Sequence, residues 1–148
     1  MKAGLIFGVT IFAGGLIFQS AQAASLNTGE PYDEMVYRLS HVICGEVEGC
    51  DRQMKEYVGS VVLNRVNSDS FPDTLGNVIF QQGQYSCVWD GNYDKAPSDE
   101  TIDVAKNLIE NGSKLPEDVV YQAEFVQGSG TYISLTAPNG VTEYFCYG

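Results

Sequence analysis

Glu46 is the residue whose position best suits acid chemistry. The stretch from Tyr32 to Val47 is predicted to form a helix. Its apolar residues Met35, Leu39 and Val42 are separated by four and three positions, so they line one face of that helix. The next step of four falls on Glu46. An apolar setting disfavours the charged carboxylate and raises its pKa, as a general acid working near neutral pH requires. The simpler alternative is that Glu46 only ends a helix at the surface.

Side chains suited to a neutral polysaccharide occur in two later parts of the chain. The segment from Gln81 to Pro97 is long and irregular, and such loops in small domains are usually functional or held in place. Aromatic faces and amide groups can bind a sugar without charge attraction. Each such residue, taken singly, is more often part of a core or a turn. Together they predict a sugar-binding groove lined by Gln84, Tyr85, Trp89, Tyr121 and Gln122.

The N-terminus has the features of a secretory signal peptide. Lys2 precedes an apolar stretch from Ala3 to Phe18, and an Ala-Gln-Ala sequence ends at Ala23. The apolar stretch is short for a membrane-spanning helix, which favours cleavage after Ala23 over a retained anchor. We therefore expect secretion, with no stable membrane anchor after cleavage. The predicted division of the chain is a signal peptide over 1–23, a linker over 24–31 and one domain over 32–148.

Charge and length restrict the partners. The chain has 8 Lys and Arg against 19 Asp and Glu, a formal net charge of −11, and cleavage would also remove Lys2. Nothing in this balance neutralises phosphates, so nucleic acid is excluded as a partner. A mature chain of about 125 residues forms one compact domain, which we expect to be a monomer.

Other catalytic chemistries have little support. A catalytic zinc site needs several converging ligands, and the chain has a single histidine, His41. Cys44 could pair with His41 as a nucleophile, but an even number of cysteines in an exported chain favours disulfides. Asp90 to Asp94 has the first spacings of a calcium loop but has Lys95 where such loops need glycine. Serine-esterase and phosphate-loop motifs do not occur in the sequence. We expect neither a metal nor a cofactor.

The elements that position these residues follow one order, with helices first and a small antiparallel sheet last. Asp51 and Ser98 are predicted N-caps of two further helices, over 52–67 and 99–111. A short helical segment is expected over 74–80. Alternating apolar residues and turn residues predict three strands, over Val119–Phe125, Thr131–Leu135 and Val141–Tyr147. The predicted fold class is α+β.

Several short motifs resemble one known family. The chain is similar to the cell wall hydrolase family of the SleB type, the spore-cortex-lytic enzymes and their relatives. The most specific part is a Val-Leu-Asn-Arg block followed by Phe-Pro-x-Thr, and the resemblance extends from about Tyr32 to Gly148. The motifs that carry it are Ile43-Cys-Gly-Glu-Val-Glu-Gly49, Val58-Gly-Ser-Val-Val-Leu-Asn-Arg-Val66, Phe71-Pro-Asp-Thr74, Asn77-Val-Ile-Phe80 and Gly83-Gln-Tyr-Ser86.

This resemblance implies a lysozyme-like fold, similar to goose-type lysozyme and lytic transglycosylases. It also implies peptidoglycan as the partner and cleavage of the bond between N-acetylmuramic acid and N-acetylglucosamine. The glutamate that matches Glu46 is the family's catalytic acid, the same residue that the helical stripe selects. The family continues with Ala-Arg-Gly-Glu, whereas this chain has Val47-Glu48-Gly49-Cys50, so its second acid is replaced by a cysteine.

The outcome of cleavage stays open between two reactions. In a lytic transglycosylase the muramoyl 6-hydroxyl attacks and gives a 1,6-anhydro product, whereas in a muramidase water attacks. Two other functions are alternatives: a non-catalytic wall-binding module on the same fold, and an amidase acting on the peptide side of peptidoglycan. The extracytoplasmic cell wall is the expected site of action in each case.

The chain has four cysteines, all after the predicted cleavage site. Cys50 follows the predicted acid and Cys87 lies in the long aromatic segment, so a Cys50–Cys87 disulfide would hold that segment beside Glu46. A Cys44–Cys50 bond is the alternative. With Cys50 and Cys87 paired, Cys44 and Cys146 would be left to pair with each other or to stay buried thiols.

Overall fold

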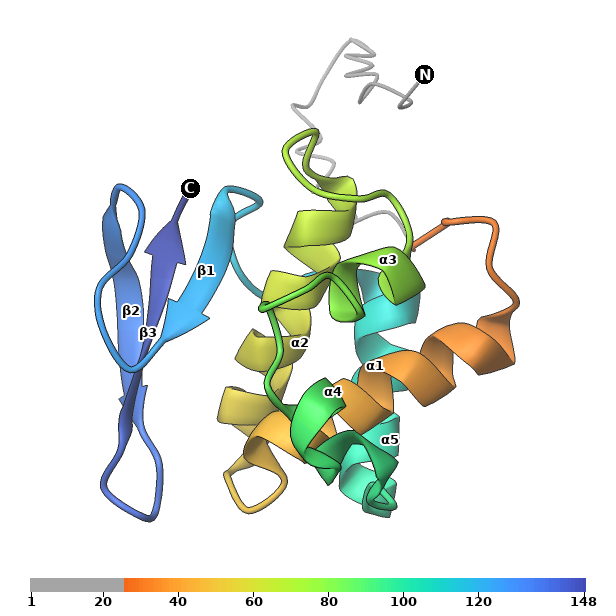
Figure 1. The fold of residues 1–148 in the computed structure, drawn as a ribbon, viewed down its shortest axis with the longest axis horizontal. Coiled ribbons are helices and arrows are strands. Elements are labelled where there is room, and N and C mark those ends of the chain that lie inside the picture. The colour runs from red at the N-terminus through yellow and green to blue at the C-terminus, as the bar shows by residue number, and fades with distance from the viewer. Residues whose placement is uncertain (1–25) are drawn as a thin grey trace, which may run out of the picture.

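The computed structural model describes residues 26–148, so the predicted signal peptide lies outside the described residues. The helices form one part of the molecule and the three-stranded sheet packs beside them (Figure 1). This order confirms the predicted α+β class. The elements are α1 (Tyr32–Val47), α2 (Arg52–Asn67), α3 (Leu75–Ile79), α4 (Cys87–Asp90), a 3-10 turn (Asn92–Asp94), α5 (Asp99–Asn111), β1 (Val119–Ala123), β2 (Gly130–Thr136) and β3 (Thr142–Tyr147).

Helix α2 is the centre of the fold and is buried on almost every side. It begins at the predicted cap, because Asp51 Oδ1 accepts a hydrogen bond of 2.9 Å from the Met54 N–H. The sequence pattern predicted one buried side, yet the polar residues Lys55, Asn64 and Arg65 are also buried. A helix enclosed in this way has neighbours on all faces, which are α1, α3, α5 and β1.

Helices α1, α2 and α5 meet at Gly59. A Cβ atom on Gly59 would lie 2.5 Å from Leu108 Cδ1 and 2.9 Å from Ile43 Cδ1, closer than real Cβ atoms approach. The absence of a side chain therefore lets the three helices pack closely. Helix α5 begins at Ser98 as predicted, with Ser98 Oγ accepting from the Thr101 N–H at 3.3 Å.

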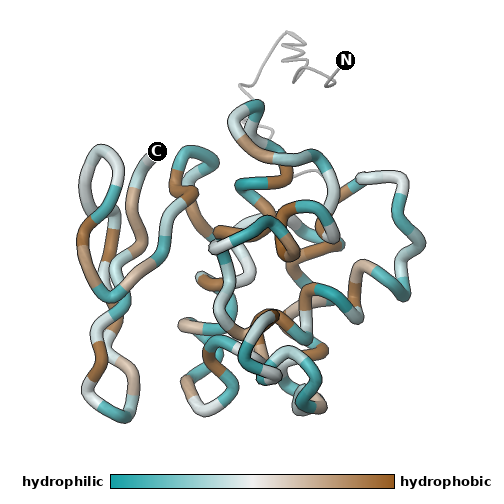
Figure 2. Tube along the Cα trace, in the orientation of Figure 1, coloured by the Kyte–Doolittle hydropathy of each residue, from teal (hydrophilic) through white to brown (hydrophobic). Residues whose placement is uncertain are grey.

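The sheet has the strand order β1-β3-β2, and both pairings are antiparallel. Its strands lie within a few residues of the predicted ones. Phe145 on β3 is fully buried and contacts the ring of Tyr57 on α2 edge-on, with 5.4 Å between centroids. Hydrophobic and hydrophilic residues alternate along β2 in Figure 2, as expected when one face of the sheet packs on helices.

Two polar side chains of α2 attach β1 to the helices. Asn64 Nδ2 donates to the carbonyl oxygens of Pro116 and Val119 at 2.7 and 2.9 Å. Arg65 Nε donates to the carbonyl oxygen of Val120 at 2.7 Å. The Asn-Arg pair of the Val-Leu-Asn-Arg block therefore has a structural role, because it places the sheet relative to α2.

Residues 26–31, expected to be a linker, are packed against the domain. Leu26 is buried, and its N–H donates to the Ile109 carbonyl oxygen at 2.8 Å. The Glu30 carboxylate accepts from the N–H groups of Leu75 and Gly76 at 2.8 and 3.1 Å, at the start of α3. This segment therefore belongs to the folded unit. Among residues 26–148, no helix is both long and apolar enough to cross a membrane.

Candidate active site

Glu46 lies in the last turn of α1, half-buried, next to the apolar stripe formed by Met35, Leu39 and Val42. All three apolar residues are buried as predicted. The backbone N–H of Cys87, at the start of α4, donates to Glu46 Oε1 at 3.3 Å. The carboxyl group is therefore held by a second element, 41 positions further along the chain.

Cys87 contacts Glu46 through its thiol as well. Its side chain is 1% exposed, and burial together with the hydrogen bond and charge of Glu46 raises the pKa of the thiol. Cys87 therefore stays protonated near neutral pH and donates toward the carboxylate. Gly45 makes this approach possible, because a Cβ on Gly45 would lie only 2.6 Å from Cys87 Cβ.

Tyr85 is placed differently from the open groove wall that we expected. It is 1% exposed, and the Arg65 guanidinium lies over its ring at 5.2 Å from the centroid. Burial and the nearby Glu46 charge raise the pKa of Tyr85 to about 12, although Arg65 acts in the opposite direction. Tyr85 thus lies behind Glu46 as part of the core and does not present its ring face to solvent.

Glu143 on β3 is a second carboxyl group that sequence reasoning missed. It lies two residues before the buried Phe145 on a regular strand, so both side chains point toward the helices. Burial, followed by the charges of Glu124 and Glu46, raises the pKa of Glu143. The charge of Glu46, on the helical part, therefore acts on Glu143, on the sheet. The available signal was the period-two spacing of Glu143 from an apolar residue.

Glu48, at the C-terminal end of α1, has a structural role. Its Oε1 accepts from the Ser98 N–H at 3.1 Å and its Oε2 accepts from the Thr101 hydroxyl at 2.8 Å. Burial alone would raise the pKa of Glu48, but the hydrogen bonds from Ser98 and Thr101 outweigh it and lower the pKa. Glu48 therefore joins α1 to the start of α5, where a negative charge is favourable.

Two of the predicted sugar-binding side chains, Gln84 and Trp89, are exposed, whereas Gln122 is half-buried. Trp89 on α4 is 65% exposed. Gln84 is exposed, and its Oε1 accepts a hydrogen bond from Arg65 Nη1 at 3.0 Å. Gln122 is paired with Phe145 across the β1–β3 ladder and so shares its helix-facing side. Its Oε1 is buried and has no hydrogen-bond partner within the described residues.

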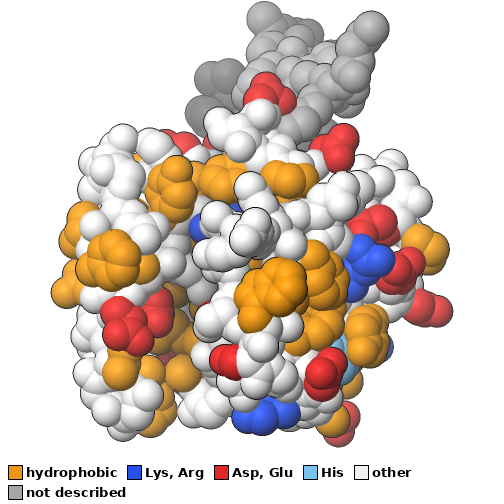
Figure 3. Space-filling view, in the orientation of Figure 1, with side chains coloured by type: hydrophobic (Ala, Val, Ile, Leu, Met, Phe, Trp, Pro, Cys, Tyr) orange, Lys and Arg blue, Asp and Glu red, His pale blue; other side chains and the backbone are white. Residues whose placement is uncertain are grey.

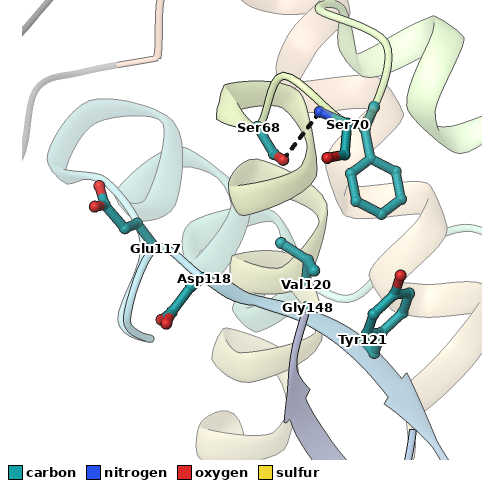
Figure 4. A pocket seen from close by; sticks show the side chains of 8 residues that line it. Ser68, Ser70, Glu117, Asp118, Val120, Tyr121 and Gly148 are labelled. Atoms are coloured by element: carbon teal, nitrogen blue, oxygen red, sulfur yellow. Dashed lines mark hydrogen bonds between the residues drawn. The ribbon is translucent and has the colours of Figure 1, made fainter. Parts of the chain in front are cut away.

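Tyr121 lies in a different place. It neighbours Gln122 on β1 and therefore points to the opposite face of the strand. Its ring lies 6.3 Å from that of Phe71, beside a cavity of about 210 Å³. Figure 4 shows Tyr121 and Ser70 on one side of this cavity, with Glu117 on the other. The structure does not bring Tyr121 to Glu46.

All four cysteines are free thiols in the structure, and the expected Cys50–Cys87 disulfide is not formed. Cys87 packs on Gly45. Burial and the charges of Asp51 and Glu143 raise the pKa of the Cys50 thiol. Cys44 Sγ lies 3.8 Å from the Lys95 carbonyl oxygen. The predicted pairing therefore has no support from this geometry. Within residues 26–148, no group of three or more His, Cys, Asp or Glu side chains is arranged to hold a metal ion.

Residues 50–138, more than half of the chain, match the family model described as Cell Wall Hydrolase. The chain belongs to the cell wall hydrolase family. The match begins at Cys50, four residues after Glu46, so it covers α2 to β2 and does not include the candidate acid. The resemblance seen in the sequence motifs is thereby confirmed.

Curated relatives of the chain are spore cortex-lytic enzymes. The one from Oceanobacillus iheyensis is 30% identical over 86 residues, which cover 57% of this chain and 31% of the relative. The one from Bacillus subtilis is 28% identical over 103 residues, 70% of this chain and 33% of the relative. The chain thus matches about a third of the length of these relatives.

Two solved structures share the fold. The catalytic domain of the germination-specific lytic transglycosylase SleB from Bacillus anthracis superposes with a TM-score of 0.61 at 21% identity, covering 80% of this chain and 98% of that domain. The catalytic domain of the Bacillus cereus SleB protein gives 0.60 at 20% identity, covering 86% and 98%. The predicted fold is confirmed.

Proposed function

We propose that this protein cleaves the glycan strand of peptidoglycan between N-acetylmuramic acid and N-acetylglucosamine, with Glu46 as the general acid. The observation that carries the proposal is the position of Glu46 at the end of a buried stripe, where the Cys87 N–H holds its carboxyl group. Membership of the cell wall hydrolase family and the SleB fold support the same reaction class.

In the first step Glu46 gives its proton to the glycosidic oxygen, and the bond from that oxygen to the anomeric carbon of muramic acid breaks. The resulting carboxylate then acts as a base. It takes the proton either of the muramoyl 6-hydroxyl, which closes the 1,6-anhydro ring, or of a water molecule, which gives a reducing end. The B. anthracis SleB domain is described as a lytic transglycosylase, which favours the anhydro outcome here.

Glu143 supplies a carboxyl group on the other side of the site. Burial, followed by the charges of Glu124 and Glu46, raises the pKa of Glu143, so the Glu143 carboxyl group retains its proton more readily than an exposed one. We infer that Glu143 supports the acid role of Glu46 while Gln84, Trp89 and Gln122 contact the sugars.

The amidase alternative needs a metal or a reactive thiol. Burial raises the pKa of the Cys44 thiol to about 11, with the hydrogen bond to Glu48 acting in the same direction. Burial also raises the pKa of Cys87 and Cys50. A thiol in such surroundings forms little thiolate at neutral pH and is a poor nucleophile. These three thiols therefore give little support to an amidase with a cysteine nucleophile.

We further propose that the protein is secreted after removal of residues 1–23 and acts as a monomer on the cell wall. Purified peptidoglycan sacculi incubated with the protein test the reaction, with mass spectrometry of the released fragments. A 1,6-anhydro product lacks one water relative to a hydrolysis product, so the same spectrum separates the two outcomes. Release of stem peptides with intact glycan strands would instead support an amidase, and absence of any release would support a binding module.

A further inference from the structure

A second cavity, of about 390 Å³, lies beside α4 and is lined by Phe80, Gln82, Gly83 and Trp89. None of these residues carries a charge. Phe80 is 45% exposed and Trp89 is 65% exposed, although both are large hydrophobic side chains. Figure 3 shows hydrophobic side chains gathered on the surface between α3 and α4. Exposed aromatic side chains around a hollow indicate a binding site.

One wall of this cavity is held firmly in place. The ring of Phe80 packs on Tyr93 with 5.3 Å between centroids, and Tyr93 packs in turn on His41 at 5.5 Å. The His41 Nδ1 atom lies 2.6 Å from the Tyr93 carbonyl oxygen. Phe80 is therefore supported from beneath by α1 while its outer face stays open. A supported aromatic face loses little freedom when a ligand covers it.

The cavity is connected to the candidate acid through α4. Trp89 lies two residues after Cys87 in the short helix α4, and the Cys87 N–H bonds to Glu46 Oε1. The Trp89 N–H donates to the Ser86 carbonyl oxygen at 2.9 Å, which fixes the turn that carries the indole. Trp89 therefore belongs to the same short helix that holds Glu46, but lies on the exposed side of this helix while Cys87 lies on the buried side.

The lining selects the chemical class of the ligand. Aromatic faces pack against the C–H faces of a pyranose ring, and the Gln82 amide offers both donors and an acceptor. The volume lies in the range of small-molecule sites. A chain with a net charge of −11 and an uncharged cavity favours a neutral ligand over an anionic one.

We propose that the cavity between Phe80 and Trp89 binds one N-acetylated sugar ring of a glycan strand and so holds the strand beside Glu46. This inference rests on the proposed function, because it names a sugar subsite for the same substrate.

Trp89 is the only tryptophan, so its fluorescence reports directly on this cavity. The experiment titrates the Glu46→Gln variant with the N-acetylglucosamine tetramer and, as a matched sugar without acetamido groups, with cellotetraose. We expect a saturable change in Trp89 emission with the first sugar and a clearly weaker response with the second. Phe80→Leu, which keeps an apolar side chain without an aromatic face, should weaken binding about tenfold. Phe125→Ala, at an exposed aromatic residue after β1, serves as the control and should leave binding unchanged.

Unchanged Trp89 emission on saturation with the tetramer would overturn the proposal, as would equal affinity of Phe80→Leu and its parent. An equal response to cellotetraose would overturn the preference for an acetamido group. The result is independent of cleavage, which is measured separately on sacculi with the unmodified protein. Cleavage without a Trp89 response contradicts only the subsite, whereas a Trp89 response without cleavage contradicts only the proposed reaction.

Discussion

The backbone N–H of Cys87 donates to Oε1 of Glu46 at 3.3 Å, and this bond joins the end of α1 to the start of α4. It fixes one oxygen of the carboxyl group. The same contact brings α4, with the exposed Trp89, next to the acid. This bond and the packing of Cys87 on Gly45 together position the segment that carries the aromatic residues against the helix that carries the acid.

Gly45→Ala should disturb this contact. The new Cβ would lie 2.6 Å from Cys87 Cβ and 3.3 Å from the Tyr93 nitrogen, so α4 must move away from Glu46. Overpacking of this kind destabilises a fold by about 1–3 kcal/mol. We expect this loss in urea unfolding, together with a larger loss of glycan cleavage. Gly49→Ala is the control, since a Cβ there meets no atom within 4 Å, and an equal effect of both substitutions would contradict the account.

Glu48→Gln should affect stability and leave most of the activity. The variant loses the charge that favours the start of α5, which contributes about 1 kcal/mol at neutral pH. Because the folded-state pKa of Glu48 lies below the ordinary 4.5, this stabilisation is present above the unfolded-state pKa. It is lost as pH falls through the folded-state value. Thermal unfolding of both proteins from pH 7 to pH 3 should therefore converge in acid, and a difference independent of pH would contradict the assignment.

Glu143→Gln should change the pH dependence of the stability in the opposite sense to Glu48→Gln. The folded-state pKa of Glu143 is raised by burial and by Glu124 and Glu46, so its contribution to stability is complete below the unfolded-state pKa. It declines as pH rises through the folded value. The variant should gain in melting temperature relative to the unmodified protein between pH 4 and pH 7. The gain should shrink in the Glu46→Gln background, and an undiminished gain there would show that the two carboxyl groups do not interact.

Asn64→Ala should loosen the sheet from α2. It removes two hydrogen bonds and leaves the carbonyl oxygens of Pro116 and Val119 without their side-chain donor. The expected loss is about 2–4 kcal/mol in urea unfolding. Asn67→Ala, at an exposed position at the end of the same helix, should change stability by less than about 0.5 kcal/mol. Similar losses in the two variants would argue against a special role of Asn64.

Much of the fold was predictable because local signals and packing agree. Asp51 and Ser98 are N-caps in the sequence and in the structure, so α2 and α5 begin where predicted. The apolar stripe of α1 is buried as its spacing indicates. The strands were recognisable from alternation between turn residues, although the strand order was not, since it depends on pairing across the sheet.

The site was less predictable because its contacts join distant positions. Tyr85 is covered by Arg65, which comes from α2. The charge of Glu46 acts on Glu143, which lies almost a hundred positions later in the sequence, and no sequence pattern near either residue indicates this interaction. Glu48 finds its partners Ser98 and Thr101 about fifty positions away. Periodicity reports which face of an element is buried, but it does not report what covers that face.

The central claim is that Glu46 is the catalytic acid, and Glu46→Gln assayed on purified peptidoglycan tests it most directly. Gln keeps the shape and can still accept from the Cys87 N–H, but it cannot give a proton. We expect release of glycan fragments, followed by mass spectrometry, to fall by about 10²-fold or more while thermal unfolding stays close to that of the unmodified protein. Glu48→Gln, measured beside it, should retain most of the release. A folded Glu46→Gln protein that releases fragments at the unmodified rate would contradict the account.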